Sequence, residues 1–166
     1  MNSGEDEVKA LADALENCSC AGLRRTMRLV TSLFDQAFAP LGLRCTQMTV
    51  LMAAALHGPT SIRNLADIVV LDASSLSRAL DPLERDGLIV REVGGSRRTR
   101  EIRITEAGMA KLEEAAPLWA EAQKVFVSVI GTQNLDAFED ILARSGRIKD
   151  LELDELKSQL KPSEAA

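Results

Sequence analysis

The stretch that decides the fold runs from Ser61 to Gly108. It reads, in order, Ser61-Ile-Arg-Asn-Leu-Ala-Asp-Ile-Val69, Leu71-Asp-Ala-Ser-Ser-Leu-Ser-Arg-Ala-Leu-Asp-Pro-Leu-Glu-Arg-Asp-Gly87, Leu88-Ile-Val-Arg-Glu-Val93, Gly94-Gly-Ser-Arg-Arg-Thr-Arg100 and Glu101-Ile-Arg-Ile104. The first two segments carry apolar residues at helical spacing, and Gly87 is a helix stop because glycine takes the left-handed conformation at low cost. The period then changes to two, which predicts two strands joined by Gly94-Gly95 and an arginine-rich tip.

Helix, turn, second helix and basic hairpin follow one another in the order of a winged helix-turn-helix. Such a unit places a short helix in the major groove of DNA while the wing reaches the backbone beside it. We expect Asp72 or Ser74 to cap the second helix, and Pro82 to kink that helix or to interrupt one of its backbone bonds. The predicted fold is mainly α with a small β-wing, flanked by N- and C-terminal helices that serve dimerisation.

The flanking helices follow from apolar residues at a period of 3.6. The predicted helices are a short one over 8–15, a long one from about Cys20 to Ala39 that Pro40 and Gly42 end, Gln47 to Leu56 with Thr46 as N-cap, Glu106 to about Ile130 ended by Gly131, one around Leu135 to Leu142, and a last short one over Leu153 to Leu160. We divide the chain into N-terminal helices (1–45), a DNA-binding domain (46–105) and C-terminal dimerisation helices (106–166). A two-fold dimer of such chains predicts a pseudo-palindromic operator.

The bulk composition indicates a cytoplasmic protein. No apolar run reaches the roughly 18 residues of a membrane span, and the start, Met1 to Glu7, is acidic where a secretory signal would be basic. The chain has 3 cysteines, too few and too closely spaced for a disulfide framework. We therefore expect reduced thiols and no membrane partner.

The net charge of −5 is unusual for a protein that binds DNA, but its distribution is not. Residues 18–104 carry twelve arginines against eight acidic residues, so the negative charge belongs to the two ends. Within the wing, Arg91 to Arg103 holds five arginines against Glu92 and Glu101. This distribution is compatible with contact to double-stranded DNA.

The residue types argue against an enzyme. The chain has 1 histidine, no phosphate-binding glycine loop and no nucleophile motif. Cys18 and Cys20 without two further ligands do not make an ordinary zinc site, so neither a metal nor a cofactor is expected. The alternative from another class is a winged-helix protein-interaction module without specific DNA binding, which the low net charge favours and the wing arginines oppose.

With these elements in place, the chain resembles the MarR family of transcriptional regulators over about residues 18–130. The resemblance rests on Leu41-Gly-Leu-Arg-Cys-Thr-Gln47, Leu65-Ala, Leu76-Ser-Arg-Ala-Leu-Asp-Pro-Leu-Glu-Arg-Asp-Gly-Leu88, the arginine-rich wing, Ile104-Thr-Glu-Ala-Gly108 and Ala116-Pro-Leu-Trp-Ala-Glu-Ala-Gln123. It implies a homodimeric DNA-binding regulator, more often a repressor, whose DNA affinity changes with a small ligand or with cysteine oxidation.

The resemblance also implies which residues contact DNA. They are Ser74, Ser75, Ser77 and Arg78 on the recognition helix, and Arg97, Arg98 and Arg100 on the wing. A solvated helix face and an ordinary polar hairpin are the alternatives. The wing tip of the family usually reads Asp-x-Arg, and this chain has Ser96 in place of the acid while it keeps Arg98. Arg63 and Arg91 are weaker candidates for phosphate contact.

Two forms of regulation follow from the same resemblance. Cys20, with Cys18 beside it, takes the place of the reactive cysteine in the hydroperoxide-sensing branch, and a helix N-terminus and nearby Arg24 favour a thiolate. That branch supports its thiolate with tyrosine hydroxyls, which this chain lacks. Cys45 or a partner subunit would supply a second thiol. A small aromatic or phenolic acid is the other effector, with Arg24, Arg28, His57 and Trp119 as possible pocket residues; the alternatives are a loop position for His57 and a core position for Trp119.

Overall fold

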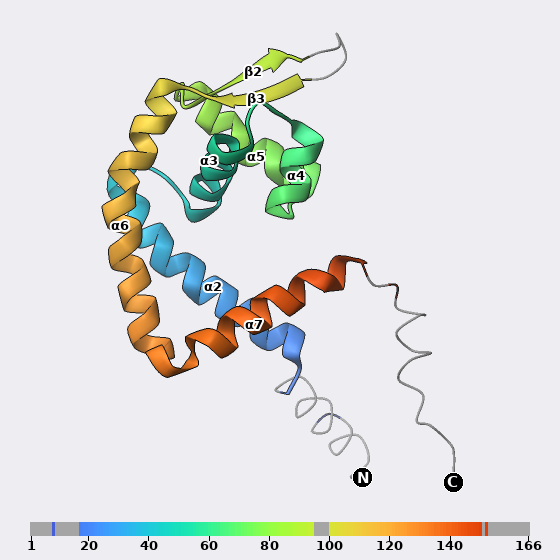
Figure 1. The fold of residues 1–166 in the computed structure, drawn as a ribbon, viewed down its shortest axis with the longest axis vertical. Helices are drawn as coiled ribbons and strands as arrows, with labels where there is room; N and C mark the ends of the chain where they lie inside the picture. The colour runs from blue at the N-terminus through green and yellow to red at the C-terminus, as the bar shows by residue number, and fades with distance from the viewer. Residues whose placement is uncertain (1–7, 9–16, 95–99, 151, 153–166) are drawn as a thin grey trace. The chain divides into compact units, whose positions relative to one another are not determined.

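The computed structural model describes residues 8, 17–94, 100–150 and 152. Its elements are α2 (Ser19–Phe38), η1 (Ala39–Leu41), α3 (Cys45–His57), β1 (Thr60–Ser61), α4 (Ile62–Val69), α5 (Ala73–Arg85), β2 (Ile89–Val93), β3 (Arg100–Ile104), α6 (Glu106–Ile130), η2 (Thr132–Asn134), α7 (Leu135–Ser145) and η3 (Gly146–Asp150) (Figure 1). The prediction of a mainly helical chain with a small β-wing is confirmed. The predicted helices over 8–15 and Leu153–Leu160 and the wing tip lie outside the described residues.

The chain forms two compact units, Met1–Gln123 and Lys124–Ala166, and α6 begins in the first and ends in the second. The predicted division at residues 45 and 105 stays a prediction. Among the described residues, no helix combines the length and the apolar character that a membrane crossing requires.

The core of the first unit lies between α3, α4, α5 and the sheet. Its fully buried side chains are Phe38, Val50, Leu51, Leu65, Leu76, Leu80, Leu83, Ile89 and Ile102. The three leucines of α5 recur at helical spacing and bury one face, which leaves the opposite face of this helix free for contact. Both helices of the helix-turn-helix are therefore packed on this core through their buried leucines.

The sheet has three antiparallel strands in the order β1-β3-β2. Strands β2 and β3 pair from Ile89 opposite Ile104 to Val93 opposite Arg100, as the predicted hairpin requires. The sequence did not predict β1, in which Thr60 pairs with Ile102 and Ser61 with Glu101. A strand of two residues is too short to show a period, so no signal was available for it.

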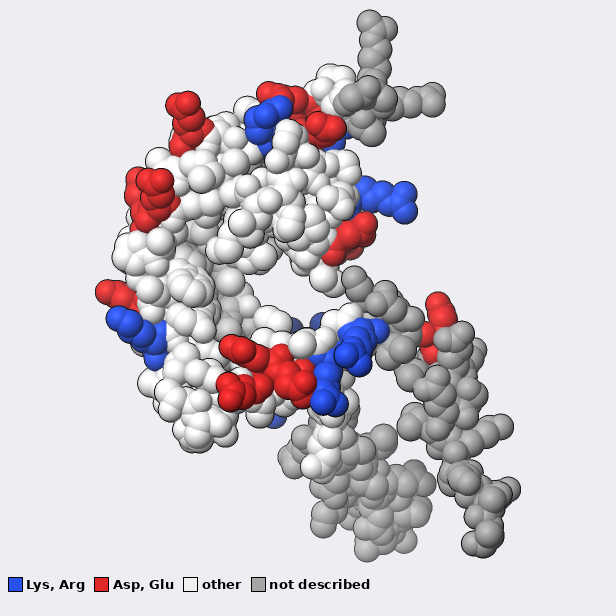
Figure 2. Space-filling view, in the orientation of Figure 1, with Lys and Arg blue, Asp and Glu red and all other residues white. Residues whose placement is uncertain are grey.

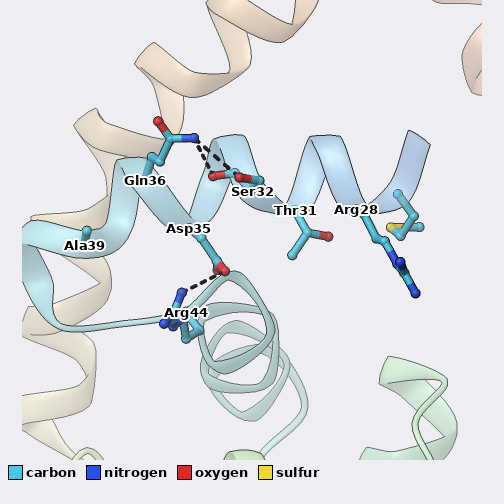
Figure 3. Close-up of a pocket in the computed structure, with 8 residues that line it drawn as sticks. Arg28, Thr31, Ser32, Asp35, Gln36, Ala39 and Arg44 are labelled. Atoms are coloured by element: carbon cyan, nitrogen blue, oxygen red, sulfur yellow. Dashed lines mark hydrogen bonds and ion pairs between the residues drawn. The ribbon is translucent and has the colours of Figure 1, made fainter. Parts of the chain in front are cut away.

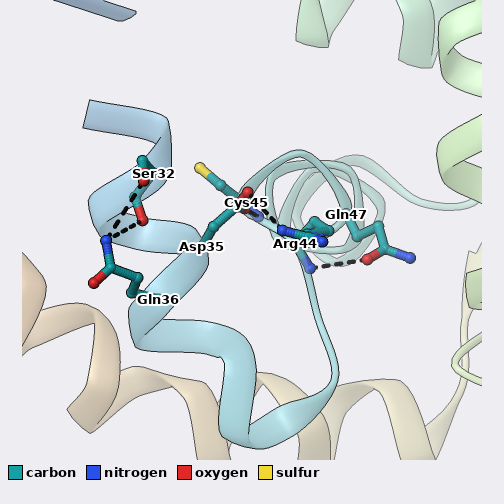
Figure 4. Close-up of polar contacts among 6 residues, drawn as sticks. All are labelled: Ser32, Asp35, Gln36, Arg44, Cys45 and Gln47. Atoms are coloured by element: carbon teal, nitrogen blue, oxygen red, sulfur yellow. Dashed lines mark hydrogen bonds and ion pairs between the residues drawn. The ribbon is translucent and has the colours of Figure 1, made fainter. Parts of the chain in front are cut away.

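The start of α3 differs from the prediction. The helix begins at Cys45, and Thr46 does not cap it. Instead, the Cys45 backbone N–H donates to Asp35 Oδ1 over 2.7 Å, and the Arg44 N–H donates to Gln47 Oε1 over 2.8 Å (Figure 4). The expected cap was wrong because the group that caps this helix lies ten positions earlier, on α2.

The second helix of the motif begins and ends as predicted. Asp72 is its N-cap, and Gly87 follows it with φ +71°. The Gly87 N–H donates to the Glu84 carbonyl, and the Leu88 N–H donates to the Leu83 carbonyl. Pro82 lies inside the helix, which continues to Arg85; because proline has no N–H, the Arg78 carbonyl loses its helical donor.

The second unit contains the end of α6 and helix α7. Gly131 has φ +86° and ends α6, so the chain turns into η2 and then α7. The rings of Phe126 and Phe138 pack with their centroids 5.5 Å apart. This ring contact joins α6 and α7 within the unit.

Candidate nucleic-acid interface

The N-terminus of α5 is organised by one carboxylate. Asp72 Oδ1 accepts the backbone N–H groups of Ser74 and Ser75, over 3.0 and 2.9 Å. It also accepts the Ser74 hydroxyl over 2.5 Å, and Asp72 Oδ2 accepts the Ser75 hydroxyl over 2.6 Å. These hydroxyl and amide donors, the Ser74 hydroxyl first, hold the pKa of Asp72 well below its ordinary value. The carboxylate is therefore ionised at neutral pH.

The predicted contact residues of this helix lie on its free face. Ser74, Ser77 and Arg78 are exposed, and Ser75 is half-buried. The Arg78 guanidinium donates to the Ser75 hydroxyl oxygen over 2.9 Å and is otherwise open to solvent. Since both serine hydroxyl protons point at Asp72, the outward side of Ser74 offers an acceptor, while Arg78 offers donors.

Of the three candidate arginines of the wing, only Arg100 lies among the described residues. Arg100 is exposed at the start of β3, opposite Val93. Arg97 and Arg98 lie outside the described residues. On the same pair of strands, Arg103 of β3 forms an ion pair with Glu92 of β2 over 3.2 Å, and both side chains are about half exposed.

Arg91, a weaker candidate for phosphate contact, has a different role. Its Nη2 lies 2.6 Å from Asp81 Oδ1 and its Nε lies 3.3 Å from Glu84 Oε2, both on α5. The Arg91 side chain is only 19% exposed, and its Nε lacks the geometry of a hydrogen bond. The Arg91 guanidinium thus joins β2 to α5. Sequence reasoning missed the pair because the partners are ten and seven positions away with a helix end and a turn between them.

Arg63, the other weaker candidate for phosphate contact, is free of intramolecular partners among the described residues. It is exposed on α4. On the face drawn in Figure 2, basic and acidic side chains alternate in small groups around the helix-turn-helix, and no broad basic patch forms.

Two apolar cavities lie elsewhere in the first unit, between α2, α3 and α6. One, of about 240 Å³, is lined by Met27, Val30, Thr31, Phe34, Phe38, Cys45, Met48, Thr49, Met52 and Trp119. The other, of about 270 Å³, is lined by Met48, Met52, Leu112, Ala115, Ala116 and Trp119. Trp119 is 46% exposed, so it is a wall of these cavities and not a core residue.

The other three predicted pocket residues lie apart from Trp119. Arg28 lines an open groove along α2, with Arg44 at its other end in an ion pair to Asp35 over 3.2 Å (Figure 3). Arg24 lines a second open groove on α2, beside Leu23 and Met27. His57 is the exposed last residue of α3 and is not among the residues that line these cavities. The structure therefore does not bring the four residues into one site.

Known proteins share this arrangement. The family model described as "MarR family" matches residues 43–98, which span α3, the helix-turn-helix and β2. Over these residues the chain is similar to the MarR family.

Relatives and solved structures extend the match beyond the helix-turn-helix. The transcriptional regulator MhqR of Bacillus subtilis is 25% identical over 75% of this chain and 86% of the relative. The regulator MosR of M. tuberculosis, solved in complex with DNA, is 28% identical with a TM-score of 0.72, over 81% of this chain and 97% of that one. The repressor CouR, solved on a 23-mer DNA duplex, is 26% identical with a TM-score of 0.73, over 81% and 96%. CouR of Rhodococcus jostii RHA1 has also been solved with p-coumaroyl-CoA (27% identical, TM-score 0.67, over 80% and 94%).

The three cysteines of the chain occupy different surroundings. Cys18 is the N-cap residue of α2, Cys20 is exposed in its first turn, and all three thiols are free. Cys45 is partly buried at the start of α3, and burial first, then the Asp35 carboxylate, raise the pKa of its thiol, against a smaller lowering by Thr49. A raised pKa disfavours the thiolate of Cys45 and with it the reaction of this thiol with an oxidant.

Proposed function

We propose that this protein is a homodimeric transcriptional regulator that binds a pseudo-palindromic operator in double-stranded DNA and represses transcription until a small ligand or cysteine oxidation releases it. The observation that carries the proposal is that α5 and strand β2 of the wing are held together by ion pairs. Helix α5 exposes Ser74, Ser77 and Arg78, and Arg91 fixes β2 against it. MosR and CouR, whose folds match, have been solved with DNA.

The chemistry of the exposed groups assigns their roles. In the major groove, the guanidinium of Arg78 can donate two hydrogen bonds to guanine O6 and N7 or hold a phosphate. The serine hydroxyl oxygens of Ser74 and Ser75, whose protons are held by Asp72, would accept rather than donate. Arg97, Arg98 and Arg100 of the wing would enter the narrow, negative minor groove or contact the adjacent phosphates.

Exposed apolar side chains support the dimer. Leu23, Met27 and Leu29 on α2 are 62–68% exposed, and Val129 on α6 is 79% exposed. On α7, Ile141 and Leu142 are 56% and 55% exposed. Apolar faces of this size on flanking helices are typical of subunit interfaces. A two-fold dimer would set two recognition helices about one DNA turn, roughly 34 Å, apart.

Either of two events would release the DNA. A small molecule would bind in the cavities beside Trp119; CouR has been solved with p-coumaroyl-CoA. Alternatively, the Cys20 thiolate attacks the terminal oxygen of an organic hydroperoxide ROOH, so that an S–O bond forms and the O–O bond breaks. The sulfur becomes a sulfenic acid, the hydroperoxide is the oxidant, and the alkoxide RO⁻ leaves and takes a proton from water to become the alcohol. Cys20 suits this reaction by its exposure in the first turn of α2.

A mobility shift on DNA from upstream of the protein's own gene tests the proposal. The reduced protein should bind, hydroperoxide or a ligand should weaken binding, and affinity should fall steeply with salt because phosphate contacts release counterions. Arg78→Ala should lower operator affinity by about 1–3 kcal/mol if Arg78 reads a base. Cys20→Ser that still leaves the DNA on oxidation would exclude control through that thiol. Absence of specific binding in every state, even at low salt, would instead favour the protein-interaction module.

A further inference from the structure

Thr105 lies where three elements of the first unit meet. It follows strand β3 directly and precedes α6 directly, as Figure 1 shows, and its hydroxyl donates to the Gly87 carbonyl at the end of α5 over 2.7 Å. The same oxygen accepts the Gly108 N–H from the first turn of α6 over 3.0 Å. A hydroxyl has one proton and two lone pairs, so it makes both bonds at once. Thr105 therefore caps α6 and also ties this helix to α5.

The end of α5 and the start of α6 are joined through two peptide units. Gly87, with φ +71°, and Leu88 close the end of α5, where the Leu88 N–H donates to the Leu83 carbonyl over 2.9 Å. The carbonyls of the same two residues accept from Thr105: Gly87 accepts its hydroxyl, and Leu88 accepts its N–H over 3.1 Å. Gly108 is buried against the Leu88 carbonyl, so closely that a Cβ on it would overlap this oxygen. The two helix ends are therefore in direct backbone contact.

The two bonds from Thr105 to the end of α5 differ in what they depend on. The bond from the Thr105 N–H to Leu88 belongs to the backbone, so it is available to any residue except proline. The bond from the hydroxyl to Gly87 depends on the side chain alone. Two points of attachment fix an orientation, whereas one point is a pivot. Without the hydroxyl, the angle between α5 and α6 would be held by one backbone bond and by packing. The Arg91 ion pairs do not replace it, because they join α5 to β2.

We propose that Thr105 is a positioning residue for DNA binding, whose hydroxyl fixes the angle between α5 and α6 and so sets the half-site spacing that a dimer accepts. Helix α6 has 25 residues, and Val125 and Val129 near its end are 49% and 79% exposed, as is typical of a subunit contact. A dimer joined through α6 would hold each α5 at the angle that Thr105 sets. One base pair of spacing moves a half-site by about 3.4 Å along the DNA. The inference rests on the proposed function and deepens it.

Half-site spacing provides a readout that a purely structural role would not change. Footprinting of the full-length protein on its operator locates the two half-sites, and operators with one base pair removed or added between them are compared with the native one. The wild type should lose at least about tenfold in affinity with either change, because one half-site leaves its register. Thr105→Val keeps the shape of the side chain and removes the hydroxyl, and its loss should be less than about threefold. Partial unfolding would weaken binding to all three operators equally, so the ratio of affinities isolates positioning.

Two further variants separate the bond between helices from the loss of a hydroxyl as such. Thr105→Ser keeps the hydroxyl and should keep the spacing preference of the wild type. Thr49→Val is the matched control, because the Thr49 hydroxyl donates to the Cys45 carbonyl over 3.0 Å within α3, and this variant should also keep the preference. Amide hydrogen exchange without DNA measures the contact itself. The Gly108 N–H donates to the Thr105 hydroxyl, so it should exchange faster in Thr105→Val and at the wild-type rate in Thr105→Ser.

The outcomes distinguish the failure of this inference from the failure of the proposed function. A wild-type protein that binds no operator specifically would remove the proposed function, and the inference with it. A wild type that binds its operator and tolerates every spacing, or a Thr105→Val variant that keeps a strict spacing, would overturn the inference alone. Equal loss of the preference in Thr105→Val and Thr105→Ser, or its loss in Thr49→Val, would also overturn it, because the hydroxyl at position 105 would then not be the cause. Unchanged exchange of the Gly108 N–H in Thr105→Val would show that the hydroxyl does not hold α6.

Discussion

The helices α3 and α5 both begin beside an aspartate, yet the two aspartates come from different places. Asp72 immediately precedes α5 and gathers the amides and hydroxyls of the next turn. Asp35 belongs to α2 and reaches across to the first amide of α3. The Asp72 side chain is exposed and caps its own helix, whereas the Asp35 side chain is only 24% exposed and joins two helices. The Asp72 cap therefore orients the exposed side chains at the start of α5, and the Asp35 cap holds α3 against α2.

The largest effect should follow from removing the cap between helices. Asp35→Ala leaves the Cys45 N–H without its acceptor and separates Arg44 from its partner. We expect the free energy of unfolding to fall by about 2 kcal/mol, near the upper end for a lost cap, because the site is partly buried. Urea denaturation followed by circular dichroism measures the change. Asp67→Ala on the exposed face of α4 is the control and should have little effect. A loss for Asp35→Ala no larger than that of the control would show that the contact between α2 and α3 does not hold the fold.

The next largest effect on the free energy of unfolding should come from removing the ion pairs of Arg91. Arg91→Gln removes the charge that joins β2 to Asp81 and Glu84, and we expect a loss of about 1 kcal/mol because the two carboxylates remain largely solvated. A double-mutant cycle with Asp81→Asn should yield a coupling energy of about 0.5–1 kcal/mol. The same cycle on operator affinity shows whether the joint between wing and helix matters for DNA. Strictly additive effects in both measurements would mean that Arg91 acts alone.

The local cap should matter less for stability and more for pH dependence. The pKa of Asp72 is lowered in the folded state, so its contribution is present above the unfolded value of about 3.9 and is lost as pH falls below it. Asp72→Asn should therefore be less stable than the wild type at pH 7, and the difference in melting temperature should narrow progressively below about pH 4. A difference that stays constant from pH 7 to pH 3 would show that the carboxylate charge contributes nothing to the cap.

The same contrast explains which parts of the fold the sequence predicted. Periodicity and local signals placed α2, α4, α5, the wing and Glu106–Ile130, and Asp72 was one of two expected caps. The helices depend on residues within one or two turns of each other, and the wing was predicted from the alternation within each strand and the glycine pair between the strands. The α3 cap and strand β1 were missed because their partners lie far along the chain, at Asp35 and at Ile102.

The candidate sites divide in the same way. The contact face of α5 follows from one helix, so Ser74, Ser77 and Arg78 could be placed on it from the sequence. The apolar cavities need three helices, and nothing local distinguishes Trp119 as a cavity wall from Trp119 as a core residue. Arg24 and Arg28 were grouped with it from the family resemblance and their charge, but both are exposed and line open grooves on α2 instead.

The smallest effect concerns the chemistry of Cys45. Asp35 is the second cause, after burial, of the raised pKa of this thiol. Asp35→Asn keeps an oxygen to accept the Cys45 N–H and removes the negative charge, so the pKa should move part of the way back toward its ordinary value while burial continues to raise it. The measurement is the pH dependence of alkylation of Cys45 in a background of Cys18→Ser and Cys20→Ser. The direction is the test: a thiol that becomes harder to alkylate at a given pH would show that the loss of the inter-helix cap buries Cys45 further, and that the structural role of Asp35 outweighs its charge.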